Sequence, residues 1–192
     1  NQASHQFKDM LMDSVKLRMR SDVPLGSCLS GGLDSSAIVC LNRRILGDNV
    51  QYHTFTGQFP GSSADESEFA DIIVKSENVT PHLVEPTAEG FVKDLADFIW
   101  FNELPVGSSS QYAQWCVFKL AKQHGVTVLL DGQGADEILG GYEQYFSPYL
   151  KARAQLVSAT DIAIEKTLIE TLLKWVKNYM KEKQLVAGVH SV

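Results

Sequence analysis

Short apolar or β-branched segments alternate along the chain with longer stretches in which apolar residues recur at helical spacing. The short segments predict strands over residues 25–29, 51–57, 80–85 and 126–130. The periodic stretches predict helices over residues 5–20, 33–46, 65–77, 87–101, 111–124 and 162–183. Thr87 and Gly125 are placed to begin and to end helices. Because strand and helix alternate, we expect an α/β fold: a doubly wound parallel sheet of about five strands with helices on both faces.

The first glycine-rich turn, SGGLDSS at residues 30–36, lies between a predicted strand and a predicted helix. Free N–H groups at a helix start attract anions, and glycines let a phosphate approach the backbone closely. The turn matches neither the Walker P-loop nor the dinucleotide fingerprint. Its carboxylate, Asp34, suits a helix cap or, alternatively, a Mg²⁺ ligand, because an acid beside phosphate needs a cation between them.

The second glycine-rich turn, DGQGADE at residues 131–137, again follows an apolar strand and again combines glycines with carboxylates. Asp136 is a candidate for a second Mg²⁺ carboxylate, and the alternative is a loop with solvated acids. Ligands of such sheets bind at the carboxyl ends of the strands, where the winding reverses. If the two preceding strands are neighbours, we expect both turns to face one pocket.

Composition narrows the class of protein further. The chain is 44% hydrophobic and 21% charged with a net charge of -6, which argues against binding to nucleic acid or to an anionic membrane. No apolar run is long enough to span a bilayer. Cys28, Cys40 and Cys116 lie in apolar stretches without metal-ligand spacing, which predicts buried, reduced thiols and a cytoplasmic location.

Three more segments accompany the two turns in order: RSDVPLG at residues 20–26, HTFTGQFPGS at 53–62 and GSSSQYA at 107–113. Together they resemble the C-terminal synthetase domain, an ATP pyrophosphatase or PP-loop domain, of the glutamine-hydrolysing asparagine synthetase family. The resemblance covers residues 5–146 and implies an adenine nucleotide alpha hydrolase-like fold. It also implies a ligase of asparagine biosynthesis: a carboxylate, aspartate by preference, attacks the α-phosphorus of Mg-ATP, pyrophosphate leaves, and ammonia then displaces AMP.

The resemblance also assigns residues to the site. The residues that it implies hold pyrophosphate are Ser30, Gly31, Gly32, Asp34, Ser35 and Ser36, and those that line the adenosine pocket are Leu29, Thr56 and Gly132. Asp34 and Asp136 would hold Mg²⁺, and Asp34, Gln133 and Asp136 are the catalytic candidates. Gln133 departs from the better-known members of the family, which have glutamate there, and this leaves the acceptor substrate open.

The expected organisation is a truncated synthetase domain over residues 1–150 and a helical tail of an incomplete C-terminal region over residues 151–192. The resemblance implies a glutaminase domain elsewhere in the whole protein, with a homodimer as an option, and we expect this fragment alone to be inactive. The family's catalytic lysine is not assigned. His53, His82 and His124 are expected to be structural. Three alternatives remain: another PP-loop ligase, such as a β-lactam-synthetase-like enzyme, a non-catalytic nucleotide-binding module, and an interaction domain whose turns are only structural.

Overall fold

The computed structural model describes residues 2–62, 65–171 and 174 of the chain. Two compact units make up the chain. The first comprises Asn1–Pro60 and Ala64–Gln133, and the second comprises Gly61–Ser63 and Gly134–Val192. The division falls inside the second glycine-rich turn, between Gln133 and Gly134. In the described part of the chain, no helix combines the length and the apolar character that a membrane crossing requires.

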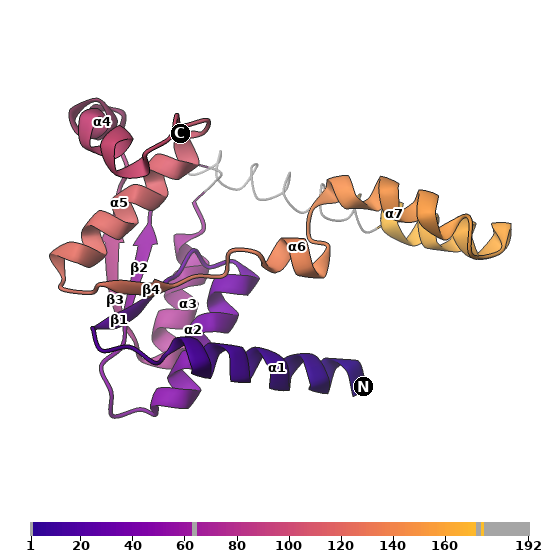
Figure 1. Cartoon of the computed structure of the whole chain (residues 1–192), viewed down its shortest axis with the longest axis horizontal. Helices are drawn as coiled ribbons and strands as arrows, with labels where there is room; N and C mark the ends of the chain where they lie inside the picture. Colours follow the sequence, from indigo (N-terminus) through magenta and orange to yellow (C-terminus); the bar gives the residue numbers. More distant parts are fainter. Residues whose placement is uncertain (1, 63–64, 172–173, 175–192) are drawn as a thin grey trace. The chain divides into compact units, whose positions relative to one another are not determined.

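The first unit is built on a parallel sheet (Figure 1). Its strands are β1 (Leu25–Cys28), β2 (His53–Gly57), β3 (Thr80–Val84) and β4 (Val128–Leu130), in the spatial order β3-β2-β1-β4. The predicted α/β class and parallel sheet are confirmed, but the described residues form four strands rather than about five, because the described chain beyond β4 is helical. The winding reverses between β1 and β4, which are hydrogen-bonded neighbours.

Five helices accompany the sheet: α1 (Gln2–Arg18), α2 (Leu33–Leu46), α3 (Ser67–Glu77), α4 (Ala88–Asn102) and α5 (Ser109–Gln123). The bounds of α2 coincide with the prediction. Thr87 caps α4 as predicted, since its Oγ1 accepts a hydrogen bond of 3.0 Å from the N–H of Gly90. α5 begins two residues before the predicted start because the side chain of Ser108 caps it by accepting from the N–H of Ser110.

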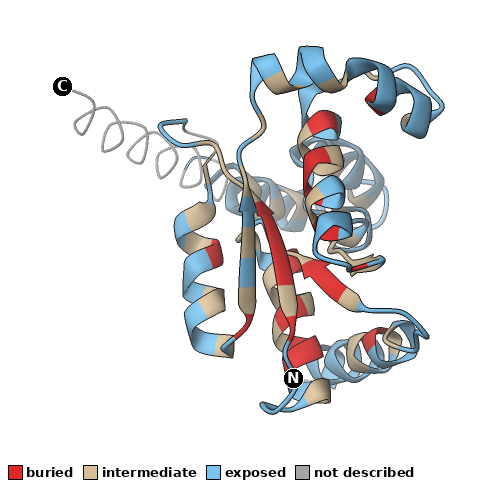
Figure 2. Cartoon of the chain, turned by 90° about the vertical axis from the view of Figure 1, so that its left-hand side faces the viewer, coloured by how far each residue is buried: buried red, intermediate tan, exposed pale blue. Residues whose placement is uncertain are grey.

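Helices cover both faces of the sheet, and each face has its own apolar core. On one face, residues of α2 and α3 pack with the strands and the segments beside them, in a cluster of Leu29, Val39, Tyr52, Ala70 and Val79. On the other face, α5 packs over Phe55 in a cluster with Val117, Ala121 and Val126. Figure 2 shows the buried residues on the strands and on the helix faces beside them. Full burial of a side chain such as Leu29, Val39 or Phe55 contributes roughly 1.5–3 kcal/mol to the free energy of unfolding.

The run VTVLL at residues 126–130 consists of apolar or β-branched residues, which predicts a parallel strand covered on both faces, but β4 is not such a strand. It contains three residues, all half-buried, and it lies at the edge of the sheet with β1 as its described neighbour. The predicted run began at Val126, which is buried but lies before the strand, where its N–H donates to the carbonyl of Ala121 at 3.0 Å. The first residue of the run therefore bonds back to the end of α5, and only residues 128–130 of the run pair with β1.

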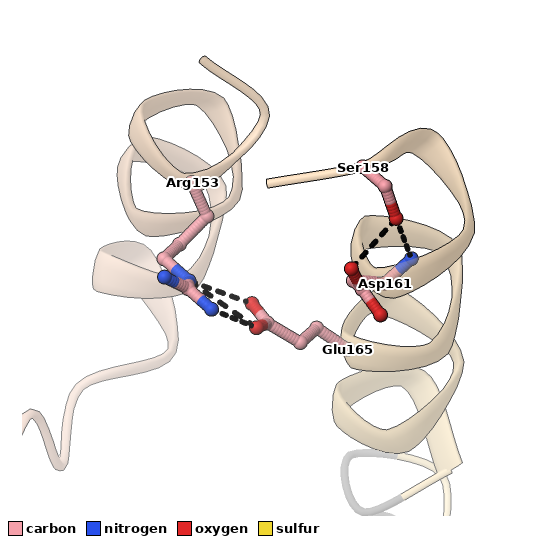
Figure 3. A network of polar contacts seen from close by, with 4 residues as sticks. All are labelled: Arg153, Ser158, Asp161 and Glu165. Carbon is pink, nitrogen blue, oxygen red and sulfur yellow. Dashed lines mark hydrogen bonds and ion pairs between the residues drawn. The ribbon is translucent and has the colours of Figure 1, made fainter. Parts of the chain in front are cut away.

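The second unit is helical, with α6 (Ala135–Leu139), the 3-10 turn η1 (Glu143–Tyr145) and α7 (Phe146–Arg153), followed by helix at 159–171 and at 174. Figure 3 shows the polar contacts that join α7 to the helix after it. The Nη2 of Arg153 lies 2.6 Å from the Oε1 of Glu165. Ser158 accepts from the N–H of Asp161 at 3.2 Å and donates to its carboxylate at 2.6 Å. The predicted helix over residues 162–183 lies partly outside the described residues.

Candidate functional site

The first glycine-rich turn packs tightly against the start of α3. A Cβ atom on Gly31 would lie 2.7 Å from the carbonyl oxygen of Glu66 and 2.8 Å from the N of Ala70. Gly31 also has a φ of 91°, in the left-handed region that side chains disfavour. Both observations require glycine at this position, so the turn approaches α3 more closely than any other residue would allow.

Hydrogen bonds within the turn fix its shape. The N–H of Ser30 donates to the Oγ of Ser35 at 3.2 Å, and the two Oγ atoms lie 3.0 Å apart. The N–H of Gly32 donates to the Oγ of Ser30 at 3.2 Å. Ser35 is buried, whereas Ser36 is half-buried and its N–H donates to the carbonyl of Gly32, which starts α2. The two hydroxyls of Ser30 and Ser35 therefore hold the turn in shape, as well as being candidate phosphate donors.

Asp34 lies in the first turn of α2 and is half-buried. Gly32, the N-cap residue, provides no side-chain cap for this helix. Among the described residues, no hydrogen bond or ion pair engages the Asp34 carboxylate, so it does not act as a side-chain cap. A carboxylate is favoured at a helix N-terminus by the helix dipole, and its oxygens stay available to a cation.

The second turn touches the first. A Cβ atom on Gly132 would lie 2.8 Å from the Cβ of Asp34 and 2.8 Å from the N of Ser35. The pairing of β1 with β4 places the ends of these strands side by side, with Ser27 opposite Leu130. The expectation that the two turns share one pocket is confirmed for the part of the second turn that belongs to the first unit, which ends at Gln133.

A pocket of about 280 Å³ opens at these strand ends. Its lining includes Leu29, together with Ser30 and Ser35 from the first turn and Asp131 and Gln133 from the second. α5 adds hydroxyl and amide side chains, namely Ser110, Gln111 and Gln114. A larger hollow of about 940 Å³ adjoins it beside α4. That hollow is apolar and contains no residue of either turn, so the smaller pocket is the better candidate site.

Thr56 lies beneath the pocket rather than on its surface. It is buried, and its Oγ1 donates a hydrogen bond of 2.5 Å to the carbonyl oxygen of Leu29. Leu29 is itself buried, and its N–H donates to the carbonyl of Phe55 at 2.9 Å. These contacts hold the end of β1 and the start of the first turn in place against β2.

Asp131 and Gln114 face the pocket but were assigned no role from the sequence. The Nε2 of Gln114 donates to the Oδ2 of Asp131 at 3.4 Å. Burial, and then the nearby negative charge and hydrogen bond of Asp131, raise the pKa of the Cys28 thiol. The sequence did offer one signal, because Asp131 follows a strand directly, at the position where such sheets carry their ligand-binding side chains.

One predicted site residue belongs to the second unit. Asp136 belongs to the second unit, in the first turn of α6, where its carbonyl accepts from the N–H of Gly141 at 2.9 Å. A Mg²⁺ site shared by Asp34 and Asp136 therefore stays a prediction. Within the described residues no cluster of three or more potential metal ligands occurs. Mg²⁺ beside phosphates requires only one or two protein carboxylates, so Asp34 alone fits part of such a site.

A parallel sheet that reverses its winding beside a glycine-rich, serine-lined turn places the first unit in the α/β class and is consistent with a PP-loop domain. The described strands and both turns agree with that class. The family model described as Asparagine synthase matches residues 6–189, and the chain belongs to this family.

Similar proteins with known names support this family assignment. The chain is 37% identical over 142 residues to a putative glutamine-hydrolyzing asparagine synthetase 2 of Methanocaldococcus jannaschii, covering 74% of this chain and 27% of that protein. It is 35% identical over 143 residues to the glutamine-hydrolyzing asparagine synthetase 1 of Bacillus subtilis, covering 74% and 22%. A more distant relative, at 27% identity over 150 residues and covering 72% and 22%, is the amidase chry2 of Gibberella zeae. The chain thus spans about a quarter of the length of these proteins.

Proposed function

We propose that this chain contains the nucleotide-binding site of an ATP-dependent, amide-forming ligase. The observation that carries the proposal is the contact of Gly132 with Asp34 and Ser35, which joins the two glycine-rich turns at the strand ends. Membership of the asparagine synthase family supports the same activity. The named relatives are synthetases several times longer than this chain, so the activity proposed is that of a longer protein.

The residues of the first turn would bind the phosphates of ATP. The Ser30, Ser35 and Ser36 hydroxyls and the N–H groups at the start of α2 would stabilise the charge of the leaving pyrophosphate. Mg²⁺, held by Asp34 and by Asp136 of the second unit, would neutralise part of that charge. Adenosine would lie beside Leu29 and Gly132, over the Thr56 hydroxyl that anchors Leu29. Positioning and charge neutralisation supply most of what such a reaction needs.

The proposed reaction has two steps. A carboxylate oxygen of the acceptor attacks the α-phosphorus, the bond from that phosphorus to the bridging oxygen breaks, and pyrophosphate leaves. Ammonia then attacks the acyl carbon, AMP leaves, and an amide forms. The names of the relatives favour aspartate as the acceptor and glutamine, hydrolysed elsewhere in the longer protein, as the source of ammonia. A cytoplasmic location suits these substrates.

Gln133 supports a second candidate, a related PP-loop ligase with a different acceptor. This neutral side chain lines the pocket where better-known members of the family have glutamate. Full-length protein supplied with ATP, ammonia and aspartate separates the two candidates. Aspartate-dependent formation of AMP and asparagine would support the first, and AMP formation only with another carboxylate would support the second.

Calorimetric titration of Mg-ATP into this chain tests nucleotide binding directly. We expect binding that needs Mg²⁺ and that Asp34→Ala weakens by at least about tenfold, the effect of about 1.4 kcal/mol of lost interaction. Asp136→Ala tests the second carboxylate. Asp9→Ala is the matched control, because Asp9 is an exposed carboxylate on α1 and belongs to neither turn. Equal affinity for Mg-ATP in all four chains would contradict the proposed metal role of Asp34.

A further inference from the structure

Three histidines far apart in the sequence gather beside β2 and β3 at the C-terminal end of α5. His53 is the first residue of β2, His82 lies in β3, and His124 is the C-cap of α5. The Nδ1 of His53 lies 2.8 Å from the Nε2 of His82, within hydrogen-bonding distance. The rings of His82 and His124 have centroids 3.8 Å apart. These three residues are called the histidine trio below.

The trio lies between the sheet and the C-terminal end of α5. In the parallel register Phe55 is opposite His82, and their rings stack with centroids 4.8 Å apart. The same Phe55 anchors the core cluster that includes Val117 and Ala121 of α5. Figure 1 shows α5 running alongside the sheet, where it contacts β2 and β3. The end of α5 therefore packs against the sheet through imidazole rings as well as through the apolar residues of this cluster.

This arrangement depends on the charge of the rings. A hydrogen bond between two imidazole nitrogens needs one N–H donor and one neutral nitrogen with a free lone pair. The ionisable groups that face His82 are His53 from β2 and His124 from α5, whose ring centroids lie 5.1 and 3.8 Å from that of His82. A second proton on the trio would therefore place like charges on neighbouring rings. Burial, followed by the charges of His124 and His53, lowers the pKa of His82.

We propose that the histidine trio forms an acid-sensitive contact that holds the C-terminal end of α5 against β2 and β3. This contact weakens as the rings take up protons. His82 binds its proton more weakly in the folded chain than in the unfolded chain. Its contribution to stability is therefore complete above the ordinary histidine pKa of about 6.5 and is lost as the pH falls from there through the lowered folded value.

A metal site is the competing interpretation, since three imidazoles are a common ligand set for zinc. In the described chain, however, no three such residues are arranged to hold a metal ion. The direct contact of 2.8 Å between two ring nitrogens is itself a satisfied hydrogen bond. The geometry thus favours protonation, and not the binding of a metal ion, as the event to which the trio responds.

The first test compares thermal unfolding of the wild-type chain, His82→Gln and a His5→Gln control. His5 is an exposed histidine on α1, so its replacement removes an imidazole without touching the trio. Midpoints are measured one pH unit above and one below the ordinary histidine pKa of about 6.5. We expect the wild-type chain and His5→Gln to lose about 2–4 °C more than His82→Gln on acidification. Equal losses in all three chains would overturn the proposal.

The second test locates the change. Amide hydrogen exchange, corrected for its intrinsic pH dependence, should show the last two turns of α5 losing protection at the lower pH while α2 retains it. His124→Gln, at the exposed C-cap, supplies a second variant if His82→Gln fails to fold. Uniform loss of protection across all helices would overturn the proposal. So would a rise in the wild-type midpoint on addition of Zn²⁺ that His82→Gln abolishes, because it would show a metal site.

Discussion

A Cβ atom added to Gly132 would lie 2.8 Å from the Cβ of Asp34, closer than two non-bonded carbon atoms in a protein tolerate. The two residues come from different turns, nearly one hundred positions apart in the sequence. Their contact leaves no space for any side chain at position 132, and the backbone N of Ser35 is equally close. The first turn therefore limits the conformation of the second. Glycine is required at position 132 because a side chain there would clash with the first turn, and not because the backbone has a positive φ.

Gly132→Ala should destabilise the chain by roughly 1–3 kcal/mol, because an extra methyl group forces two packed backbones apart. Urea unfolding followed by circular dichroism measures the change. Gly107→Ala is the matched control, since a Cβ atom there meets nothing within 4 Å and the residue does not have a positive φ. A Gly132→Ala chain as stable as the Gly107→Ala chain would show that the turns separate without cost.

Arg43 should be one of the costliest residues of α2 to replace. It is 5% exposed, and its guanidinium donates to the carbonyls of Glu77, Asn78, Val50 and Gly47 at 2.8, 2.6, 2.5 and 3.2 Å. Arg43→Met removes four hydrogen bonds that a charged donor makes to partly buried carbonyls, so we expect a loss of at least about 2 kcal/mol. Arg44→Met changes the adjacent, exposed arginine and should have little effect. Similar urea midpoints for the two variants would contradict this prediction.

Tyr52 organises a buried polar network between α2 and the sheet. Its hydroxyl lies 2.6 Å from the Oγ of Ser27 and accepts from the Nδ2 of Asn42 at 2.7 Å. Burial raises the pKa of Tyr52 to about 12, so the hydroxyl stays protonated and can donate to Ser27. Tyr52→Phe should cost roughly 1–2 kcal/mol, because both partners lose a hydrogen bond inside the core. Thermal unfolding measures it, with Tyr145→Phe in the second unit as control; a loss no larger than the control's would contradict the prediction.

The Cys28 thiol should react slowly with iodoacetamide in the folded chain. Burial and the charge of Asp131 raise its pKa, and the thiolate is the reactive form. At about pH 8 we expect alkylation at least about tenfold slower than in urea, where the pKa returns to about 8.5. Peptide mass spectrometry follows each cysteine separately. Equal rates with and without urea would show that the thiol is accessible and unperturbed.

Local signals predicted the elements next to the candidate site well. The bounds of α2 follow from a glycine turn and a clear apolar periodicity, and Thr87 at the start of α4 is a polar cap before an apolar run. Composition also predicted the free cysteines in part: Cys116 is buried, whereas Cys28 and Cys40 are half-buried. These features are set by residues close to one another in the sequence, so no knowledge of the tertiary fold is needed.

The tertiary contacts could not be predicted from the pattern of residues along the sequence. β4 was expected to be covered on both faces because its run is apolar or β-branched throughout, yet its place in the sheet depends on which strands pair. The histidine trio likewise depends on register, since only the pairing of β2 with β3 brings His82 beside His53. The Gln114–Asp131 contact joins α5 to the second turn across the fold. The joint metal role of Asp34 and Asp136 stays a prediction for the same reason.

The two edges of the sheet are chemically unequal. β3 carries Pro81, which has no N–H to offer an incoming strand, and proline is one of the devices that protect sheet edges. β4 consists of Val128, Leu129 and Leu130, with no proline and no charge. A strand that paired with the outer edge of β3 would therefore lack one hydrogen bond at Pro81, whereas every residue of β4 keeps its N–H.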